Sequence, residues 1–484
     1  MSSGTKAWEA PEPPRFWTLD RVADALGPVV LTPPPRGTGS FSAVNTDTRT
    51  VAPGNVFVAL RGDRFDAHAF LGEAVAKGAT ALVVSDAAAA ATLGVPVFVV
   101  HDTTIALGLL GRYRRRVWGK TVVAVAGSNG KTSTKELTSA ALGARLSVYA
   151  TRGNLNNHVG VPLTLLAIPD AADVAVVEIG TNHPGEVATL RALVEPDVAI
   201  VTSIGEEHLE GLVDLAGVLR EESAVFANVP VAIVPAGQPE IGDAARAMAR
   251  STVSAGLASG DLRPDGWSIT PEGTGCLRFG DVEVKPPLRG EHNLRNAMLA
   301  VATARALGVS IEDAAAGIAR TNALPMRSAW VEIGAFTVIN DAYNSNPGSA
   351  RESLRMLAAL NTSRQRVVVL GSMLELGAAG PALHDEIARL ALAGPAHVVA
   401  GIGEFARALA GAAPNDSRVV TAPDVPELWS LLSSRLAKDA VILLKGSRGT
   451  KLERLIPLIE QQPTADGRQP TAKSSQPASA SDQH

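Results

Sequence analysis

The segment Thr121–Thr134 is the feature that most constrains how this chain can fold. It reads Thr-Val-Val-Ala-Val-Ala-Gly-Ser-Asn-Gly-Lys-Thr-Ser-Thr, so an apolar run from Val122 to Ala126 leads directly into a glycine-rich loop. The apolar run predicts a buried strand, and the residues from Ser133 to Leu142 follow a helical pattern. This order is typical of a phosphate-binding loop, because glycines let backbone N–H groups approach phosphate oxygens and a helix start favours an anion.

The loop predicts a binding site for nucleotide phosphates. Lys131 would reach the outer phosphates of ATP, and the hydroxyl of Thr132 would face a magnesium ion. The longer P-loop pattern is incomplete because Val125 stands where its first glycine would be, so the shorter form G-x-x-G-K-T remains. The alternative interpretation is a glycine turn with a surface lysine. The loop residues expected to bind ATP are Gly127, Ser128, Asn129, Gly130, Lys131, Thr132 and Ser133.

Polar side chains follow two further predicted strands. Glu178 ends the apolar run Val174–Ile179, and His208 comes shortly after the run Val198–Ser203. In open α/β sheets, ligands bind beyond the carboxyl ends of the strands. We therefore expect Thr132, Glu178 and His208 to converge as ligands for Mg²⁺, which otherwise keeps water and takes phosphate oxygens. Taken singly, Glu178 fits a helix-capping role and His208 an ordinary loop histidine.

A chain of 484 residues is too long for one hydrophobic core, and its strands alternate with helices throughout. We predict an α/β protein of three domains, with a mostly parallel sheet in the centre and a Rossmann-like C-terminal domain. The predicted boundaries are a disordered N-terminus at 1–15, domains at 16–115, 116–327 and 328–460, and a disordered tail at 461–484. Strands outside the centre are expected at Val56–Leu60, Ala81–Val84, Phe336–Asn340, Arg366–Leu370, His397–Ala400 and Ala440–Leu444.

Composition indicates the cellular location and the kinds of partner to expect. Cys276 is the only cysteine, so no intrachain disulfide can form and a reducing cytoplasm is expected. The formal net charge of −4 gives no argument for nucleic acid as a partner. The first residues lack the apolar core of a signal peptide, and no apolar run approaches the ~20 residues of a membrane helix. We therefore expect a cytoplasmic protein without membrane insertion.

Taken together, the motifs resemble those of the Mur ligase family over all three predicted domains, from about Phe16 to Glu460. The matching segments are Asn45–Arg49 with Pro53-Gly54, Gly127–Thr132, Gly153–Asn157, Glu178–Glu186, His208–Gly211, Gly290–Asn293 with Asn296, Pro325–Arg327, Asp341–Pro347 and Lys445–Arg448. Three of these segments separate one member of the family from its sister ligases. They are Asn-His-Pro-Gly-Glu, Tyr-Asn-x-Asn-Pro and Lys-Gly-Ser-Arg.

The resemblance implies a role for each matched segment. The first domain would bind the UDP end of the substrate through Thr48 and Arg49, and Asn154, Asn156 and Asn157 would line the sugar-peptide path. Asn293 would contact the adenine of ATP, Asp341 the ribose, and Arg327 the γ-phosphate. The third domain would close over the others, with Lys445, Ser447 and Arg448 as candidates for binding the amino substrate. Lys131, His208, Arg327 and Glu222 would form the catalytic set.

The reaction implied is an ATP-dependent amide ligation in peptidoglycan precursor synthesis. D-Ala-D-Ala would be joined to a UDP-N-acetylmuramoyl-tripeptide through an acyl phosphate, with Mg²⁺ as cofactor. A monomer is expected. Two alternatives are a sister ligase that adds a single amino acid to a shorter peptide, and an ATP-binding regulator without turnover.

Two positions depart from the family pattern. Ala67 stands where relatives usually have glycine, and the second departure is larger. Many relatives carry a carbamylated lysine in a helix shortly after the metal histidine, and alignment forward from His208 places Glu222 there. No lysine occurs between Lys135 and Lys285, so that modification cannot form at this position. We expect Glu222 to supply the negative charge directly. The alternative is a solvated glutamate on a helix surface beside Arg220 and Glu221.

Overall fold

The computed structural model describes residues 16–33, 35–37, 39–62, 65–322 and 324–462. The predictions for the N-terminus at 1–15, and for the tail from residue 463 onwards, lie outside the described residues. The chain divides into two compact units. One comprises residues 1–120 with 151–170, and the other comprises residues 121–150 with 171–484. Each unit is described by itself below.

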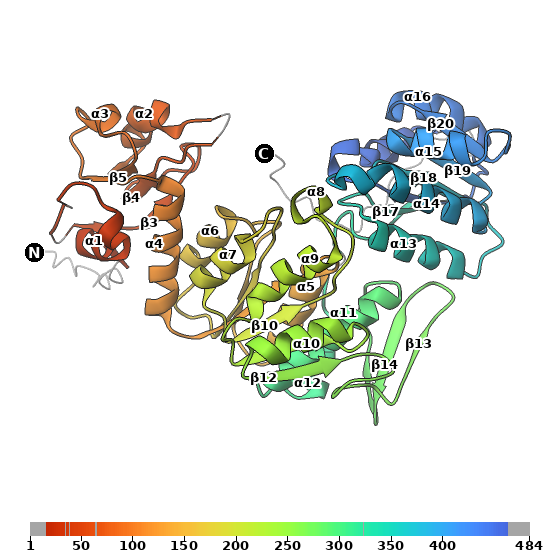
Figure 1. Cartoon of the computed structure of the whole chain (residues 1–484), viewed down its shortest axis with the longest axis horizontal. Coiled ribbons are helices and arrows are strands. Elements are labelled where there is room, and N and C mark those ends of the chain that lie inside the picture. Colours follow the sequence, from red (N-terminus) through yellow and green to blue (C-terminus); the bar gives the residue numbers. More distant parts are fainter. Residues whose placement is uncertain (1–15, 34, 38, 63–64, 323, 463–484) are drawn as a thin grey trace, which may run out of the picture. The chain divides into compact units, whose positions relative to one another are not determined.

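The first unit contains a parallel sheet of four strands in the order β3-β4-β5-β6 (Figure 1). Its strands are β3 (Ala43–Asn45), β4 (Asn55–Val58), β5 (Ala79–Val84) and β6 (Val97–Val99). A short pair, β1 (Trp17–Thr18) and β2 (Ser40–Phe41), is antiparallel. The helices are α1 (Leu19–Leu26), α2 (Leu71–Ala76), α3 (Ala87–Ala90), α4 (Thr103–Trp118) and α6 (Gly160–Leu166). Side chains of β4 and β5 alternate between two cores, one with α1 and α4 and the other with α2 and α3.

The second unit begins with a sheet of six parallel strands in the order β12-β11-β10-β7-β9-β8. The strands are β7 (Thr121–Ala126), β8 (Val148–Ala150), β9 (Val174–Glu178), β10 (Val198–Val201), β11 (Val231–Pro235) and β12 (Ser251–Ala255). The chain builds the sheet on one side of β7 and then crosses to the other, so β7 marks the switch point where ligands bind in such sheets. The strands predicted at Val122–Ala126, Val174–Ile179 and Val198–Ser203 are confirmed as β7, β9 and β10.

Helices enclose this sheet. One core joins it to α5 (Lys131–Leu142), α11 (Glu291–Ala306) and α12 (Ile311–Ile318). The other helices of this part are α7 (Glu186–Val194), α8 (Leu209–Leu212), α9 (Leu215–Ser223) and α10 (Pro239–Met248). A small antiparallel sheet follows from β13 (Gly266–Ile269), β14 (Gly275–Phe279) and β15 (Val282–Val284). Nearly continuous Val, Ala and Ile in the central strands β7, β9, β10 and β11 suit a sheet that is covered by helices on both faces.

The rest of the second unit contains a second six-stranded sheet, in the order β16-β17-β21-β18-β19-β20. It is parallel except for the edge strand β16. The strands are β16 (Ala329–Ile333), β17 (Phe336–Asp341), β18 (Arg366–Leu370), β19 (Val398–Ile402), β20 (Val419–Ala422) and β21 (Val441–Lys445), which confirms the four strands predicted here. One face packs on α13 (Pro347–Ala359), α14 (Gly380–Ala393) and α15 (Glu404–Ala412), and the other on α16 (Val425–Leu432) and α17 (Leu455–Glu460).

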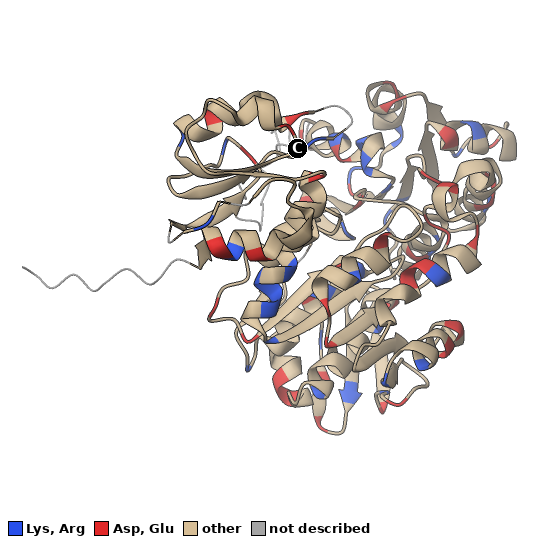
Figure 2. Cartoon of the chain, turned by 60° about the vertical axis from the view of Figure 1, so that its left-hand side comes forward, with Lys and Arg blue, Asp and Glu red and all other residues tan. Residues whose placement is uncertain are grey.

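Charged residues are mixed along these elements. Figure 2 shows positions of Lys and Arg interspersed with positions of Asp and Glu over much of the ribbon. None of the helices in the described ranges is both long enough and apolar enough to cross a bilayer.

Candidate active site

The glycine loop after β7 is held against the end of β10. Gly127 has φ of 115°, and a Cβ atom there would lie 2.4 Å from Thr202 Oγ1, so only glycine fits. The backbone N–H of Ser128 donates to Ser203 O at 2.8 Å, and the N–H of Asn129 donates to Ser203 Oγ at 3.1 Å. The loop is therefore fixed at the carboxyl edge of the sheet, beside its switch point.

Helix α5 starts from Gly130, in the left-handed region at φ 85°. No side chain in the described part of the chain caps this helix start. A Cβ atom at Gly130 would lie 2.6 Å from Asn296 Oδ1, so this glycine also permits close packing. Thr132 and Ser133 follow in the first turn and are buried. Uncapped N–H groups with the positive end of the helix dipole make this turn a binding site for an anion.

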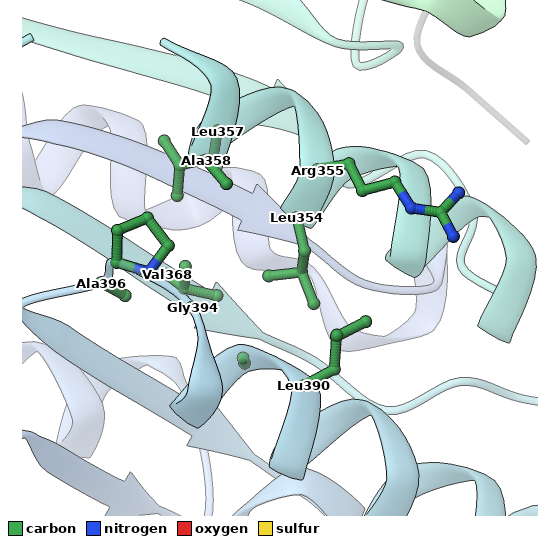
Figure 3. A pocket seen from close by; sticks show the side chains of 10 residues that line it. Leu354, Arg355, Leu357, Ala358, Val368, Leu390, Gly394 and Ala396 are labelled. Carbon is green, nitrogen blue, oxygen red and sulfur yellow. The ribbon is translucent and has the colours of Figure 1, made fainter. Parts of the chain in front are cut away.

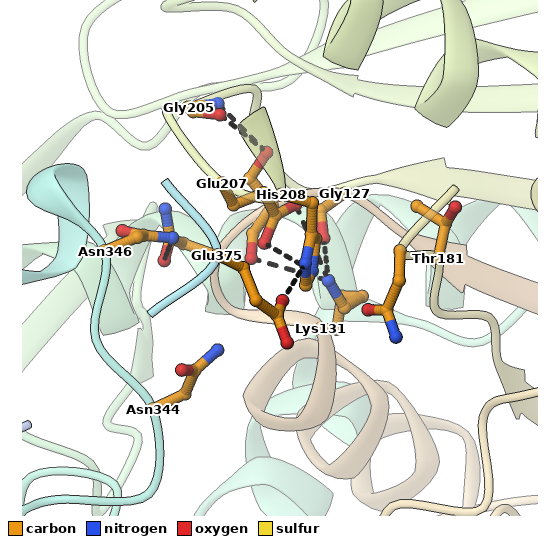
Figure 4. Close-up of polar contacts among 12 residues, drawn as sticks. Gly127, Lys131, Thr181, Gly205, Glu207, His208, Asn344, Asn346 and Glu375 are labelled. Carbon is orange, nitrogen blue, oxygen red and sulfur yellow. Dashed lines mark hydrogen bonds and ion pairs between the residues drawn. The ribbon is translucent and has the colours of Figure 1, made fainter. Parts of the chain in front are cut away.

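Lys131 lies at the centre of the site (Figure 4). Its Nζ donates to Gly127 O at 2.5 Å and lies 3.9 Å from Glu207 Oε1. Burial disfavours the ammonium, but the charges of Glu207 and Glu222 outweigh that effect and raise the pKa of Lys131. The lysine is therefore a fixed cation beside the loop.

Glu222 of α9 contacts the phosphate loop directly. Its Oε2 accepts a hydrogen bond of 2.7 Å from the N–H of Gly127, and its side chain is fully buried. The interpretation of Glu222 as a solvated surface residue is therefore wrong. Burial, together with the nearby charge of Glu207, raises the pKa of Glu222 to about 7 against the attraction of Lys131.

The neighbouring Glu221 binds the start of helix α7 and not the phosphate loop. Its Oε2 accepts from Gly185 N and its Oε1 from Val187 N, each at 2.7 Å. These groups belong to the start of α7, so Glu221 satisfies backbone donors that the helix leaves free. The sequence pair Glu221-Glu222 thus combines a helix-capping residue with a residue of the loop.

His208 adopts a left-handed conformation, with φ of 50°, immediately before α8. Its Nδ1 lies 2.5 Å from Glu375 Oε2, and its Nε2 lies 3.7 Å from Glu207 Oε2 (Figure 4). Burial lowers the pKa of the imidazole, but the hydrogen bond to Glu375 and the charge of Glu207 outweigh it, so the pKa is raised overall. The Nε2 edge therefore faces the carboxylate nearest Lys131.

Oxygen atoms around the loop fit a magnesium ion bound together with phosphates. Thr132 Oγ1, Glu207 Oε1 and Glu222 Oε1 are buried and have no hydrogen-bond partner among the described residues. Glu178, at the end of β9, is paired in register with Val125 and is also buried. Among the described residues, no three His, Cys, Asp or Glu side chains are grouped as a complete metal site. Mg²⁺ takes few protein ligands and completes its shell with phosphate oxygens and water.

Asp341 and Lys445, which were predicted to contact different ligands, form an ion pair of 2.9 Å. Lys445 is buried and its Nζ also donates to Asn344 O at 2.9 Å. Asp341 accepts from Ser353 Oγ at 2.6 Å. The guanidinium of Arg327 stacks on the ring of Tyr343, 4.1 Å from its centroid. The ion pair between Asp341 and Lys445 joins the end of β17 to the end of β21.

The remaining predicted residues of the second unit are held by local contacts. Asn293 Nδ2 donates to Arg289 O at 2.8 Å, which leaves its amide at the start of α11. Ser447 Oγ accepts from Leu374 N at 3.1 Å, and the Arg448 guanidinium contacts Met326 Sδ.

Five predicted substrate contacts lie in the first unit: Thr48, Arg49, Asn154, Asn156 and Asn157. Arg49 is half-exposed and pairs with Asp47 at 2.7 Å, while Thr48 O accepts from Lys77 Nζ at 3.0 Å. The side chain of Asn157 accepts from Gly160 N at 2.8 Å at the start of α6. The structure therefore brings together in one unit the residues assigned to the UDP-linked substrate.

The sequence interpretation missed four residues at the loop: Glu207, Asn346, Arg351 and Glu375. Asn346 Nδ2 donates to Asn129 Oδ1 at 2.9 Å, and Arg351 Nη1 lies 3.1 Å from Glu206 Oε2. Glu207 directly precedes His208, and Glu375 follows the end of β18. The carboxyl ends of parallel strands were a signal for both glutamates.

An apolar pocket lies elsewhere, between α13 and α14 over β18 (Figure 3). Its lining is apolar apart from Arg355, and includes Leu354, Leu357, Val368 and Leu390. It offers neither a nucleophile nor a metal ligand, so we assign it no chemistry.

A phosphate loop at the switch point of a parallel sheet, followed by a second, Rossmann-like sheet, is the arrangement of an ATP-dependent ligase. Three family models match this chain: the Mur ligase family catalytic domain at residues 40–159, the Mur ligase middle domain at 125–304, and the Mur ligase glutamate ligase domain at 326–448. The chain belongs to the Mur ligase family, and the predicted three-domain architecture is confirmed.

Individual relatives point to one branch of that family. The UDP-N-acetylmuramoyl-tripeptide–D-alanyl-D-alanine ligase of Escherichia coli K12 is 35% identical over 441 residues, which cover 88% of this chain and 95% of the relative. A crystal structure of MurF from Acinetobacter baumannii has a TM-score of 0.81 at 32% identity and covers 92% of this chain and 98% of its own. The crystal structure of MurF ligase from Thermotoga maritima in complex with ADP has a TM-score of 0.76 at 26% identity. The match covers 86% of this chain and 96% of the Thermotoga chain.

Proposed function

We propose that the chain catalyses the reaction for which these relatives are named, the ATP-dependent joining of D-Ala-D-Ala to UDP-N-acetylmuramoyl-tripeptide. The products would be the pentapeptide precursor of peptidoglycan, ADP and phosphate. The observation that carries the proposal is the buried loop site, where Lys131 lies between the glycine backbone and the carboxylates Glu207 and Glu222. A cation held in this way suits the terminal phosphates of ATP, and the named relatives supply the choice of substrates.

The mechanism follows from the chemistry of the substrate. A carboxylate is a poor electrophile, so the γ-phosphoryl group of ATP is first moved to the terminal carboxylate of the tripeptide. The amine of D-Ala-D-Ala then attacks the acyl phosphate, and phosphate leaves from a tetrahedral intermediate. Lys131 and the first turn of α5 bind and orient the phosphates, and Arg327 offsets the charge that develops on the transferred group.

Mg²⁺, when bound, would neutralise charge on the phosphate oxygens as a Lewis acid. The residues that would hold it are Thr132, Glu178 and His208, with Glu222 supplying negative charge from the loop side. Mg²⁺ prefers oxygen ligands, and the buried Thr132 Oγ1 and Glu222 Oε1, which have no hydrogen-bond partner among the described residues, support the parts given to Thr132 and Glu222.

The other contacts are proposed from their positions. Thr48, Arg49 and the asparagines between 154 and 157 bind the UDP-muramoyl substrate in the first unit. Asn293 contacts the adenine and Asp341 the ribose. Lys445 pairs with Asp341 and so acts on the amino substrate by fixing the segment at the end of β17. Ser447 and Arg448, which follow the end of β21, contact that substrate.

We also propose domain boundaries at 16–115, 116–327 and 328–460, a cytoplasmic location where ATP is available, and action as a monomer.

The test is an assay of ATP turnover with each substrate omitted in turn. We expect phosphate release only with UDP-muramoyl-tripeptide, D-Ala-D-Ala and Mg²⁺ together. Turnover with single amino acids and a shorter peptide in place of the dipeptide would instead identify a sister ligase. ATP binding without turnover under every combination would identify a regulator. Comparing tripeptides that carry diaminopimelate or lysine would define the acceptor.

A further inference from the structure

Glu375 reaches the metal histidine from the other sheet of the second unit. It lies in the segment after β18, whereas His208 follows β10. The 2.5 Å contact joins Glu375 Oε2 to His208 Nδ1, and it is drawn in Figure 4. A carboxylate only accepts hydrogen bonds, so Nδ1 must carry the proton of this contact. The lone pair of the neutral ring is then on Nε2, the edge that faces Glu207 and Lys131.

The segment that carries Glu375 is held from several sides. Met373 N donates to the buried His384 Nε2 at 2.9 Å, and Leu374 N donates to Ser447 Oγ at 3.1 Å. Glu375 itself has φ of 63°, a conformation that costs energy for a residue other than glycine. These contacts fix the backbone beside Glu375, so the start of its side chain is placed before any ligand binds.

The same segment docks on α8. Glu210 N donates to Glu375 O at 3.2 Å, and a Cβ atom at Gly377 would lie 3.2 Å from Glu210 Cα. His208, at the start of α8, also has a positive φ. Two residues with unfavourable backbone conformations therefore meet through their side chains, which marks a functional contact rather than general packing.

We propose that Glu375 is a positioning residue for His208, fixing the protonated Nδ1 and aiming Nε2 at the metal and phosphate site. Protein ligands to metals are commonly oriented by a carboxylate on the second ring nitrogen. Here that carboxylate belongs to the part of the chain that carries the amino-substrate candidates. Binding of the metal–nucleotide and docking of this segment then favour each other, because thermodynamic coupling between two sites is reciprocal. This inference rests on the proposed function.

The first test needs neither metal nor substrate. Nitrogen-15 NMR of the histidine rings at alkaline pH reports which ring nitrogen carries the proton, and His208→Asn identifies the signal. We expect the Nδ1–H form in the parent and its loss in Glu375→Ala, whereas Glu375→Gln keeps it because an amide oxygen still accepts. The matched control is Glu386→Ala, which removes a carboxylate paired with Arg351 instead of His208. An unchanged tautomer in Glu375→Ala would overturn the inference.

The second test measures metal affinity directly. Electron paramagnetic resonance can follow Mn²⁺ binding in the presence of a non-hydrolysable ATP analogue. We expect Glu375→Ala to bind Mn²⁺ about tenfold more weakly. Metal affinity typically falls on this scale when a residue that orients a metal-binding histidine is removed. The Glu375 side chain is 52% exposed, so the unfolding temperature should hardly change. Equal affinity in parent and variant would refute the role of Glu375 alone, while a parent that binds no Mn²⁺–nucleotide would refute the proposed function itself.

Discussion

Asn346 Nδ2 donates a hydrogen bond of 2.9 Å to Asn129 Oδ1, so the start of α13 touches the phosphate loop. The other end of the same amide is also engaged, because Asn346 Oδ1 accepts from Ser349 N at 2.8 Å and caps α13. One turn further along, Arg351 pairs with Glu206 beside the loop. The position of α13 is therefore linked to the conformation of the loop that is proposed to bind ATP.

This contact predicts that docking of α13 depends on nucleotide. We expect Arg351→Ala to weaken docking by about 1 kcal/mol, because its ion pairs are only partly exposed. Small-angle scattering with and without an ATP analogue should show compaction in the parent, and the variant should need several-fold more nucleotide. Arg355→Ala is the control, since Arg355 pairs with Glu352 on its own helix. Identical scattering of the parent with and without substrates would contradict a closing mechanism.

Lys131→Ala should abolish ligation while the fold persists. We expect kcat to fall by about a thousandfold or more, the scale on which phosphoryl-transfer sites lose activity without a charge-stabilising cation. The strands around the loop keep their packing, so circular dichroism should be unchanged. Lys285→Ala is a control for removing one lysine, because Lys285 is exposed and pairs only with Glu283 among the described residues. Near-parental turnover in Lys131→Ala would remove the basis of the nucleotide assignment.

Much of this fold could be predicted because its strands carry strong local signals. The run Arg366–Leu370 is β18 as predicted, and Val122–Ala126 lies within β7. The loop between β7 and α5 was predictable for the same reason, since its glycines, lysine and helix are contiguous. The order of strands in each sheet was not, because parallel pairing joins residues that are far apart in the sequence.

Contacts between distant segments account for what the sequence interpretation missed. His208 was found as a candidate ligand, but nothing near it in sequence indicated Glu375, 167 residues away. Asp341 and Lys445 were each found by motif, and their ion pair appears only when β17 and β21 lie side by side. Burial of Glu222 likewise depends on how α9 packs against the loop, which a helical pattern alone does not specify.

Gly127→Ala tests the geometry of the loop. A methyl group there would lie 2.4 Å from Thr202 Oγ1 and 2.6 Å from Thr202 N, and φ of 115° is unfavourable for alanine. We expect the free energy of unfolding to fall by about 2–4 kcal/mol, because the cost of overpacking adds to the cost of backbone strain. Gly411→Ala in α15 meets nothing within 4 Å and should raise stability by up to about 1 kcal/mol. Urea titrations of both variants would measure the difference, and equal midpoints would contradict the loop geometry.

Glu222→Gln should separate stability from activity. Burial raises the pKa of Glu222 to about 7 in the folded protein, above its ordinary value of 4.5, so the folded state binds this proton more tightly than the unfolded state. The resulting stabilisation is fully present below pH 4.5 and is lost as the pH rises through 7. Glutamine keeps the size without the charge, so the variant should unfold at a higher temperature than the parent above pH 7. The two unfolding temperatures should converge in acid, and parallel curves from pH 4 to 9 would contradict a raised pKa.

The same substitution should impair catalysis. A bound magnesium–nucleotide would favour ionised Glu222, so its binding should release a proton near pH 7, and less as the pH rises to 8. Titration calorimetry in buffers of different ionisation enthalpy would measure that release, which Glu222→Gln should abolish. The variant should also turn over far more slowly and need more Mg²⁺. The parent should not require bicarbonate, because no carbamate has to form. If Glu222→Gln matched the parent at low Mg²⁺, the buried carboxylate would have no role in the reaction, and its contact with Gly127 would only shape the loop.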